Sequence, residues 1–114
     1  MTGRIDVKVR VRRGDEIAMG PGKADLLDAI AATGSISAAA RSMDMSYRRA
    51  WLLVDVMNRS FRAPLVASAA GGAQGGGATV TDAGRQVLAQ FRAIEAAAAL
   101  ATQSHLKAFT KLLA

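Results

Sequence analysis

The chain has 114 residues, of which 51% are apolar and only 4% aromatic, so it can build one domain around an aliphatic core. Its formal charge of +6 favours a polyanionic partner, either nucleic acid or an acidic membrane surface. The lack of cysteine excludes disulfides, thiolate zinc sites and a cysteine nucleophile. Since no signal peptide or membrane span is visible either, we expect a cytoplasmic protein with no membrane partner.

Residues 4–13 alternate between aliphatic and mostly charged side chains. The aliphatic set is Ile5, Val7, Val9 and Val11, and the charged set is Arg4, Asp6, Lys8, Arg10 and Arg12. A period of two with β-branched residues predicts a half-buried strand over 4–13 with a basic outer face. The following residues, 14–22, contain Gly-Pro-Gly and are expected to form a loop.

Apolar residues at helical spacing predict two helices next. The first covers 23–33 and buries a stripe of four side chains, Leu26, Leu27, Ile30 and Ala31. Gly34 follows at the place where a left-handed C-cap is expected. The second helix is short, is capped by Ser35 or Ser37, and ends at Met43.

A third helix is expected from Tyr47 to about Arg59. Ser46 can cap it, because a serine hydroxyl accepts a hydrogen bond from the free backbone N–H groups of a first turn. The apolar stripe of this helix is Ala50, Leu53, Val54 and Met57. Trp51, the only tryptophan, lies beside that stripe, and burial against the first helix is the favoured interpretation over base stacking.

The remaining residues predict a β-hairpin followed by a long helix. Two short β segments within 65–80 flank a glycine-rich tip. The helix covers 82–102, and we expect a break at 103–105 before a last helical turn.

Three helices followed by a hairpin is the element order of a winged helix. We therefore expect one domain over 1–114, mostly α, with an N-terminal strand, a long C-terminal helix and a β-hairpin wing at 65–80. The helix-turn-helix itself covers 37–61. A short helix, a turn and a helix also occur in bundles that bind no DNA, so the basic charge and the hairpin are what favour a DNA-binding function.

In a helix-turn-helix the second helix enters the major groove with its N-terminal residues on the base edges. Arg48 and Arg49 lie at that end, where the helix dipole disfavours cations but where arginine suits phosphate and guanine. Gln74 lies in the wing where a cation was expected. The candidate DNA-binding residues are Ser37, Arg41, Ser46, Tyr47, Arg48, Arg49, Gln74, Gly75 and Thr79.

Several short motifs in this region carry a resemblance to a known family. They are Gly34–Ser37, Ala39, Ala40, Met45–Arg48, Ala50, Trp51, Met57, Asn58, Leu65, Val66, Gly75–Ala78, Thr81 and Gly84. With them the chain resembles the N-terminal domain of the ModE family, molybdate-responsive transcription regulators with a winged helix of the LysR type. The resemblance implies a sequence-specific regulator that binds double-stranded DNA as a homodimer and is linked to molybdenum homeostasis.

The long last helix is expected to hold the dimer. An apolar stripe that extends past the body of a small domain usually buries itself in a second copy. The expected dimerisation residues are Val87, Phe91, Ile94 and Ala98.

Two other functions stay open at this point. The chain could be a partner subunit that modulates a full-length regulator without reading DNA. It could also bind molybdate or tungstate directly, with Ser35, Ser37 and Lys23 as the candidate donors. The regulators of the family carry C-terminal oxyanion-binding domains that this chain ends before, so the resemblance assigns no molybdate site here.

The sequence offers no constellation typical of an enzyme. Its acidic residues are scattered, and His105 has no clustered metal ligands beside it. We therefore expect no catalysis, no metal site and no cofactor.

Overall fold

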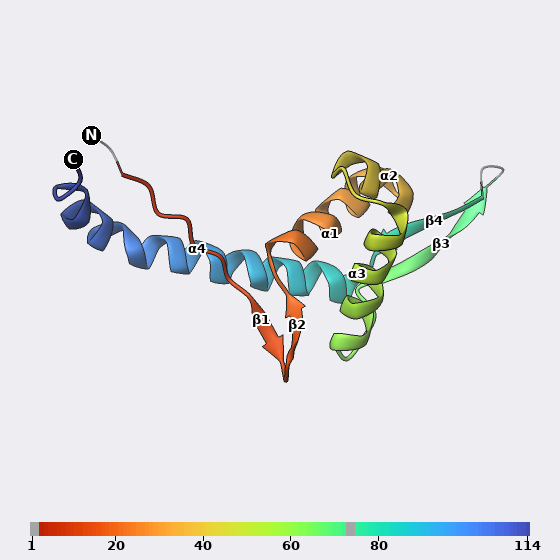
Figure 1. The fold of residues 1–114 in the computed structure, drawn as a ribbon. Helices are drawn as coiled ribbons and strands as arrows, with labels where there is room; N and C mark the ends of the chain where they lie inside the picture. Colours follow the sequence, from red (N-terminus) through yellow and green to blue (C-terminus); the bar gives the residue numbers. More distant parts are fainter. Residues whose placement is uncertain (1–2, 73–74) are drawn as a thin grey trace.

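The computed structural model describes residues 3–72 and 75–114. In these ranges the chain forms four helices and two antiparallel hairpins. The first three helices pack together as a head, from which the second hairpin of the chain projects. The fourth helix leaves the head as a long arm (Figure 1). The molecule measures 59 × 28 × 23 Å. The expected mostly α winged-helix architecture is confirmed.

The N-terminal strand was predicted too long. Strand β1 covers only Val11–Arg13, and it pairs with β2 (Glu16–Met19), a segment predicted as a loop. Gly14 has a φ of 62°, which a glycine adopts without strain at the first position of a two-residue turn. Alternation detects extended backbone but does not reveal whether a partner strand exists. Residues 4–10 run extended and unpaired beside the far part of α4 (Asp82–Thr110), as Figure 1 shows.

The three helices of the head begin and end close to where the sequence predicts. Helix α1 covers Pro21–Thr33, α2 covers Ile36–Ser42 and α3 covers Tyr47–Ser60. Proline occupies the first turn of α1, where its missing N–H costs nothing. Gly34 closes α1 in the left-handed conformation, with a φ of 76°.

The core lies where α1, α2 and α3 meet the hairpin and the start of α4. Its large, fully buried side chains are Met19, Leu26, Leu27, Ile30, Met57 and Leu65. Ala31, predicted in the buried stripe of α1, is exposed. The stripe of α3 is buried at Ala50, Val54 and Met57, as its spacing predicted.

The second hairpin pairs β3 (Val66–Gly72) with β4 (Gly75–Val80). Their antiparallel register places Val66 opposite Val80 and Ala67 opposite Thr79. Val66 and Val80 are buried in the core, so the base of the hairpin is fixed to the head while its tip extends outward (Figure 1). This is the wing.

Helix α4 runs without interruption to Thr110, so the predicted end at 102 and the break at 103–105 are wrong. Gln103, Ser104 and His105 all keep their backbone N–H groups and are tolerated inside a helix, and only proline or glycine would have favoured a stop. None of the helices in the two described ranges is both long and apolar enough to cross a lipid bilayer.

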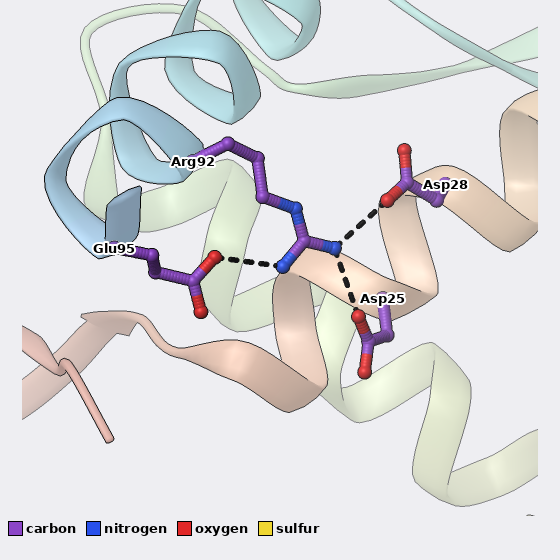
Figure 2. A network of polar contacts seen from close by, with 4 residues as sticks. All are labelled: Asp25, Asp28, Arg92 and Glu95. Carbon is purple, nitrogen blue, oxygen red and sulfur yellow. Dashed lines mark hydrogen bonds and ion pairs between the residues drawn. The ribbon is translucent and has the colours of Figure 1, made fainter. Parts of the chain in front are cut away.

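An ion-pair network joins α4 to α1. The Arg92 guanidinium donates to Asp25 and Asp28 of α1, each at 2.8 Å, and to Glu95 of α4 at 2.9 Å (Figure 2). Asp25 and Asp28 lie on the exposed face of α1. The hydrogen bonds to Asp28, Glu95 and Asp25 raise the pKa of Arg92 above its ordinary value. The network therefore links the arm to the head.

Candidate nucleic-acid interface

The turn between α2 and α3 presents the start of α3 to solvent. Ala39 and Ala40 of α2 are fully buried, and their small side chains let the two helices approach closely. The carbonyl oxygen of Ala40 accepts from the backbone N–H groups of both Met43 and Met45, which closes the turn. Asp44 has a φ of 55°, a conformation that aspartate tolerates in tight turns.

Serine side chains cap both helices of this unit. The Ser35 hydroxyl accepts from the Ala38 N–H at 3.0 Å, which decides between Ser35 and Ser37 as the cap of α2. The Ser46 hydroxyl accepts from the Arg49 N–H at 3.1 Å, as predicted for α3. The caps fix where α3 begins, and with it the direction of the first side chains of that helix.

Three cations of this unit are exposed. Arg41 at the end of α2 and Arg48 and Arg49 in the first turn of α3 form no ion pair with any residue in 3–72 or 75–114. By contrast, Arg59 at the other end of α3 pairs with Asp55 and Glu16. The charges of Arg41, Arg48 and Arg49 are therefore available to a polyanion. Arg48 and Arg49 do not stabilise α3 through the helix dipole, because they lie at its N-terminus.

A groove of about 360 Å³ lies between α3, the start of α2 and the wing. Tyr47 and Trp51 of α3 line one wall, Ser68 and Ala78 of the wing line the opposite wall, and Ser37 lies at the α2 end. Tyr47 is 55% exposed and Ser37 is half-buried. The structure thus brings Ser37 and Tyr47 together at one groove, beside Ser46, Arg48 and Arg49 on the adjoining turn.

Trp51 is placed differently from the prediction. Burial against α1 was expected, but 47% of this residue is exposed and it lines the groove. The buried stripe of α3 at Ala50, Val54 and Met57 already fills the contact with the head. Trp51 therefore points away from α1, on the same face as Tyr47 one helical turn earlier.

The width of the groove is fixed by contacts at both strands of the wing. The Asn58 side chain of α3 accepts from the N–H groups of Leu65 and Val66 at 2.8 and 3.0 Å, and donates to the Val66 carbonyl at 3.0 Å. On the other strand, the Ala78 N–H donates to the Gly34 carbonyl at 2.8 Å. A Cβ on Gly77 would lie 2.7 Å from that same oxygen, so only glycine allows this approach.

Asn58 and Gly77 belong to the motifs of the family resemblance, but the sequence did not indicate their structural roles. Asn58 reads as an ordinary polar residue near a helix end, and its three hydrogen bonds reach residues seven and eight positions later. Gly77 lies in a run of glycines that predicts a flexible tip rather than a close backbone contact. The roles of Asn58 and Gly77 follow only from the position of the hairpin against α3 and Gly34.

Other predicted site residues lie outside the groove. Thr79 borders a separate hollow on the α1 side of the wing, together with Ile30 and Arg85. Gly75 is the first residue of β4 and pairs with Gly72. Gln74 falls outside the described residues.

Lys23 does not converge with Ser35 and Ser37, the other two candidate donors for an oxyanion. Lys23 lies in the first turn of α1 and both serines follow the end of that helix, and the ten residues from Lys23 to Thr33 extend about 15 Å along the helix axis. The Lys23 ammonium donates to the Ile17 carbonyl, and burial lowers the pKa of Lys23. Ser35 already uses its hydroxyl as a cap.

The predicted dimerisation residues fall into two groups. Phe91 is only 2% exposed and Val87 packs against the chain's own core, so both contribute to the fold of the single chain. Ile94 is exposed and Ala98 is half-buried. Farther along the arm, the exposed apolar side chains are Leu100, Phe109, Leu112 and Leu113.

Comparison with known proteins follows the same elements. The family model for bacterial regulatory helix-turn-helix proteins of the lysR family matches residues 23–85, from α1 to the start of α4. The chain is 51% identical over 81 residues to the molybdenum-pterin-binding protein MopB of Rhodobacter capsulatus, covering 71% of this chain and 30% of that protein. It is 49% identical over 70 residues to the molybdenum transport protein ModE of Azotobacter vinelandii, covering 61% of this chain and 26% of that protein.

A more distant relative is named for DNA binding. The chain is 32% identical over 85 residues to the DNA-binding transcriptional dual regulator ModE of Escherichia coli K12, covering 75% of this chain and 32% of that protein. The chain therefore spans about a third or less of the length of these relatives. The resemblance to the ModE family predicted from the sequence is confirmed.

Proposed function

We propose that this chain, which belongs to the lysR family of bacterial regulatory helix-turn-helix proteins, reads specific sequences of double-stranded DNA and regulates transcription. One observation carries the proposal. The first turn of α3 presents Arg48 and Arg49, both exposed and without a carboxylate partner among the described residues, at the edge of the groove between α3 and the wing. An arginine there can donate two hydrogen bonds to guanine or pair with phosphate.

Five of the other candidate residues have roles consistent with this docking. Ser46 and Tyr47 lie beside the arginines and offer hydroxyl groups to phosphate or base edges, and Ser37 does so from α2. Arg41 supplies charge to a flanking phosphate. Gly75 lies close to the wing tip, where backbone N–H groups can approach phosphate without a side chain between them.

The arm supports a homodimer. It exposes apolar side chains that no element of the single chain covers within residues 3–72 and 75–114, among them Leu100 at 77% exposure and Phe109 at 60%. If the arms of two copies packed against each other, the exposed apolar side chains of both arms would be buried. Two reading helices would then enter successive major grooves about 34–36 Å apart.

The names of the relatives suggest what is regulated. Two of the three relatives described above are named for molybdenum transport or molybdenum-pterin binding. We infer that the target genes of this chain serve molybdenum supply. Direct oxyanion binding is not part of the proposal, because Lys23 lies at the far end of α1 from Ser35 and Ser37.

The test is a selection of bound duplexes from a random pool with the purified chain alone, followed by a salt titration on the selected sequence. We expect one near-palindromic sequence, and Arg48→Ala should weaken its binding by about tenfold to a hundredfold if Arg48 reads a base. Arg62→Ala is the matched control, because Arg62 is an exposed arginine beyond the opposite end of α3. Equal affinities and equal salt slopes for wild type and Arg48→Ala would remove Arg48 from the interface. A chain that binds no duplex without a second protein would favour the partner-subunit function.

A further inference from the structure

Trp51, the only tryptophan of the chain, is not part of the hydrophobic core. Trp51 leaves 47% of its surface in solvent, although a large aromatic side chain usually stabilises a small domain by burial. The core of the head is already filled by aliphatic residues, and the described polar residues leave no buried side-chain atom that needs the indole N–H. The exposed ring is therefore available to a ligand.

The Trp51 ring lies in a groove whose two walls are held in fixed positions. Trp51 and Tyr47 lie one helical turn apart and together form the aromatic wall of the groove. The opposite wall is the wing, which Asn58 and Gly34 hold at a fixed distance through backbone hydrogen bonds. A ligand that enters the groove meets the indole without any rearrangement of α3.

Charge identifies the occupant as DNA. Arg48 and Arg49 adjoin Tyr47 in the first turn of α3, Arg41 lies at the end of α2, and the whole chain carries a charge of +6. These cations adjoin the groove without lining it, and an apolar side chain from a partner protein would leave them without a counter-charge. A duplex would place its phosphates against the cations and its base edges against the exposed face of α3.

The chemistry of indole then limits what Trp51 can read. Indole has one N–H donor and no acceptor, so it cannot make the paired hydrogen bonds by which arginine or asparagine distinguishes bases. The one apolar group on the base edges of the major groove is the C5 methyl of thymine. We propose that Trp51 is a specificity-determining residue that packs its ring on a thymine methyl group. This inference rests on the proposed DNA-binding function.

Intrinsic fluorescence gives the first readout, because Trp51 is the only tryptophan in the sequence. Titration with the duplex selected above should change the emission and protect the ring from quenching by acrylamide. A random duplex at a salt concentration that prevents non-specific binding is the control. Emission and quenching that stay unchanged in the fully bound state would overturn the contact.

Replacement of thymine by deoxyuridine, one position at a time, gives the decisive readout, because it removes the methyl group and nothing else. We expect a loss of about fourfold in affinity at one position of each half-site, the value for burial of one methyl-sized group. Trp51→Ala should bind the thymine duplex about tenfold more weakly and should no longer distinguish thymine from uracil at that position. Trp51→Phe should keep part of the discrimination.

Arg48→Ala is the matched control for this scan. It should bind more weakly overall and still distinguish thymine from uracil, because its Trp51 is intact. A flat uracil scan on wild type, or discrimination that survives in Trp51→Ala, would overturn the inference while leaving sequence-specific binding in place. A purified chain that binds no duplex at all would overturn both proposals.

Discussion

The head and the arm of this molecule differ in how far their apolar side chains are buried. The head and the wing bury most of their large aliphatic side chains, Leu52 being an exception, and expose cations beside one groove. The arm exposes Leu100 and Phe109, and the extended residues 4–10 beside it expose Ile5 and Val7. The difference indicates that the head is complete within one chain, whereas the arm needs a second surface to cover it.

The largest expected effect is a difference in unfolding free energy between a substitution in the head and one in the arm. Leu27 is fully buried in the head, so Leu27→Ala should lower the free energy of unfolding by about 2–5 kcal/mol. Leu100→Ala in the arm should change the unfolding of the isolated chain by less than about 0.5 kcal/mol. Urea unfolding over a range of protein concentrations measures both.

Leu100 also tests the proposed dimer. Leu100→Asp should move the monomer–dimer equilibrium toward monomer by at least about tenfold, because it places a charge in an apolar contact. Sedimentation at several concentrations gives the result. A dimer of unchanged strength would mean that the arm is covered by something other than a second arm.

A glycine in the wing provides the next comparison. In Gly77→Ala the new Cβ would lie 2.7 Å from the Gly34 carbonyl oxygen, so the wing must move away from the head. We expect a loss of about 1–3 kcal/mol in stability and weaker DNA binding through a distorted groove. Gly22→Ala is the matched control, because open space surrounds Gly22 in the first turn of α1 and alanine favours a helix. Thermal unfolding of the two variants should shift in opposite directions, and similar shifts would contradict the close contact.

The helix cap at the start of α3 should have a smaller effect. Ser46→Ala removes the acceptor for the Arg49 N–H and should cost about 1 kcal/mol in stability. Ser46→Asp restores an acceptor and should recover that stability, yet it brings a negative charge to the proposed DNA-binding face and should weaken duplex binding. Unfolding and duplex titration of both variants separate the cap from the interface. Equal DNA affinity for Ser46→Asp and wild type would place Ser46 away from the phosphates.

The sequence predicted the head well because its signals are local. Ser46 as a cap, Gly34 as a C-cap and the stripe of Ala50, Val54 and Met57 each depend on neighbours within a few positions. Two of the errors lie where a distant partner decides the outcome. Residues 4–10 have the alternation of a strand but no strand beside them, and Trp51 has the composition of a core residue but lies opposite the wing.

The candidate site divides in the same way. Arg48 and Arg49 could be predicted from their place in a helix-turn-helix, because that place follows from chain order alone. Asn58 and Gly77 could not, since their roles come from hydrogen bonds and close contacts with residues of another element. The proposed DNA-contacting residues could thus be predicted from the sequence, whereas the structural roles of the residues that set the width of the groove could not.

The smallest expected effect lies at the junction of head and arm, where Arg92 joins Asp25, Asp28 and Glu95 (Figure 2). These side chains are partly exposed, so Arg92→Ala should cost no more than about 1 kcal/mol in stability, and added salt should reduce the difference. The more informative measurement is DNA affinity. If the network sets the angle of the arm, Arg92→Ala should weaken binding to a duplex with two half-sites more than binding to a single half-site, because only the paired site depends on the distance between two heads. An equal change on both duplexes would show that the apolar contacts of Phe91 and Val87 fix that angle without the ion pairs.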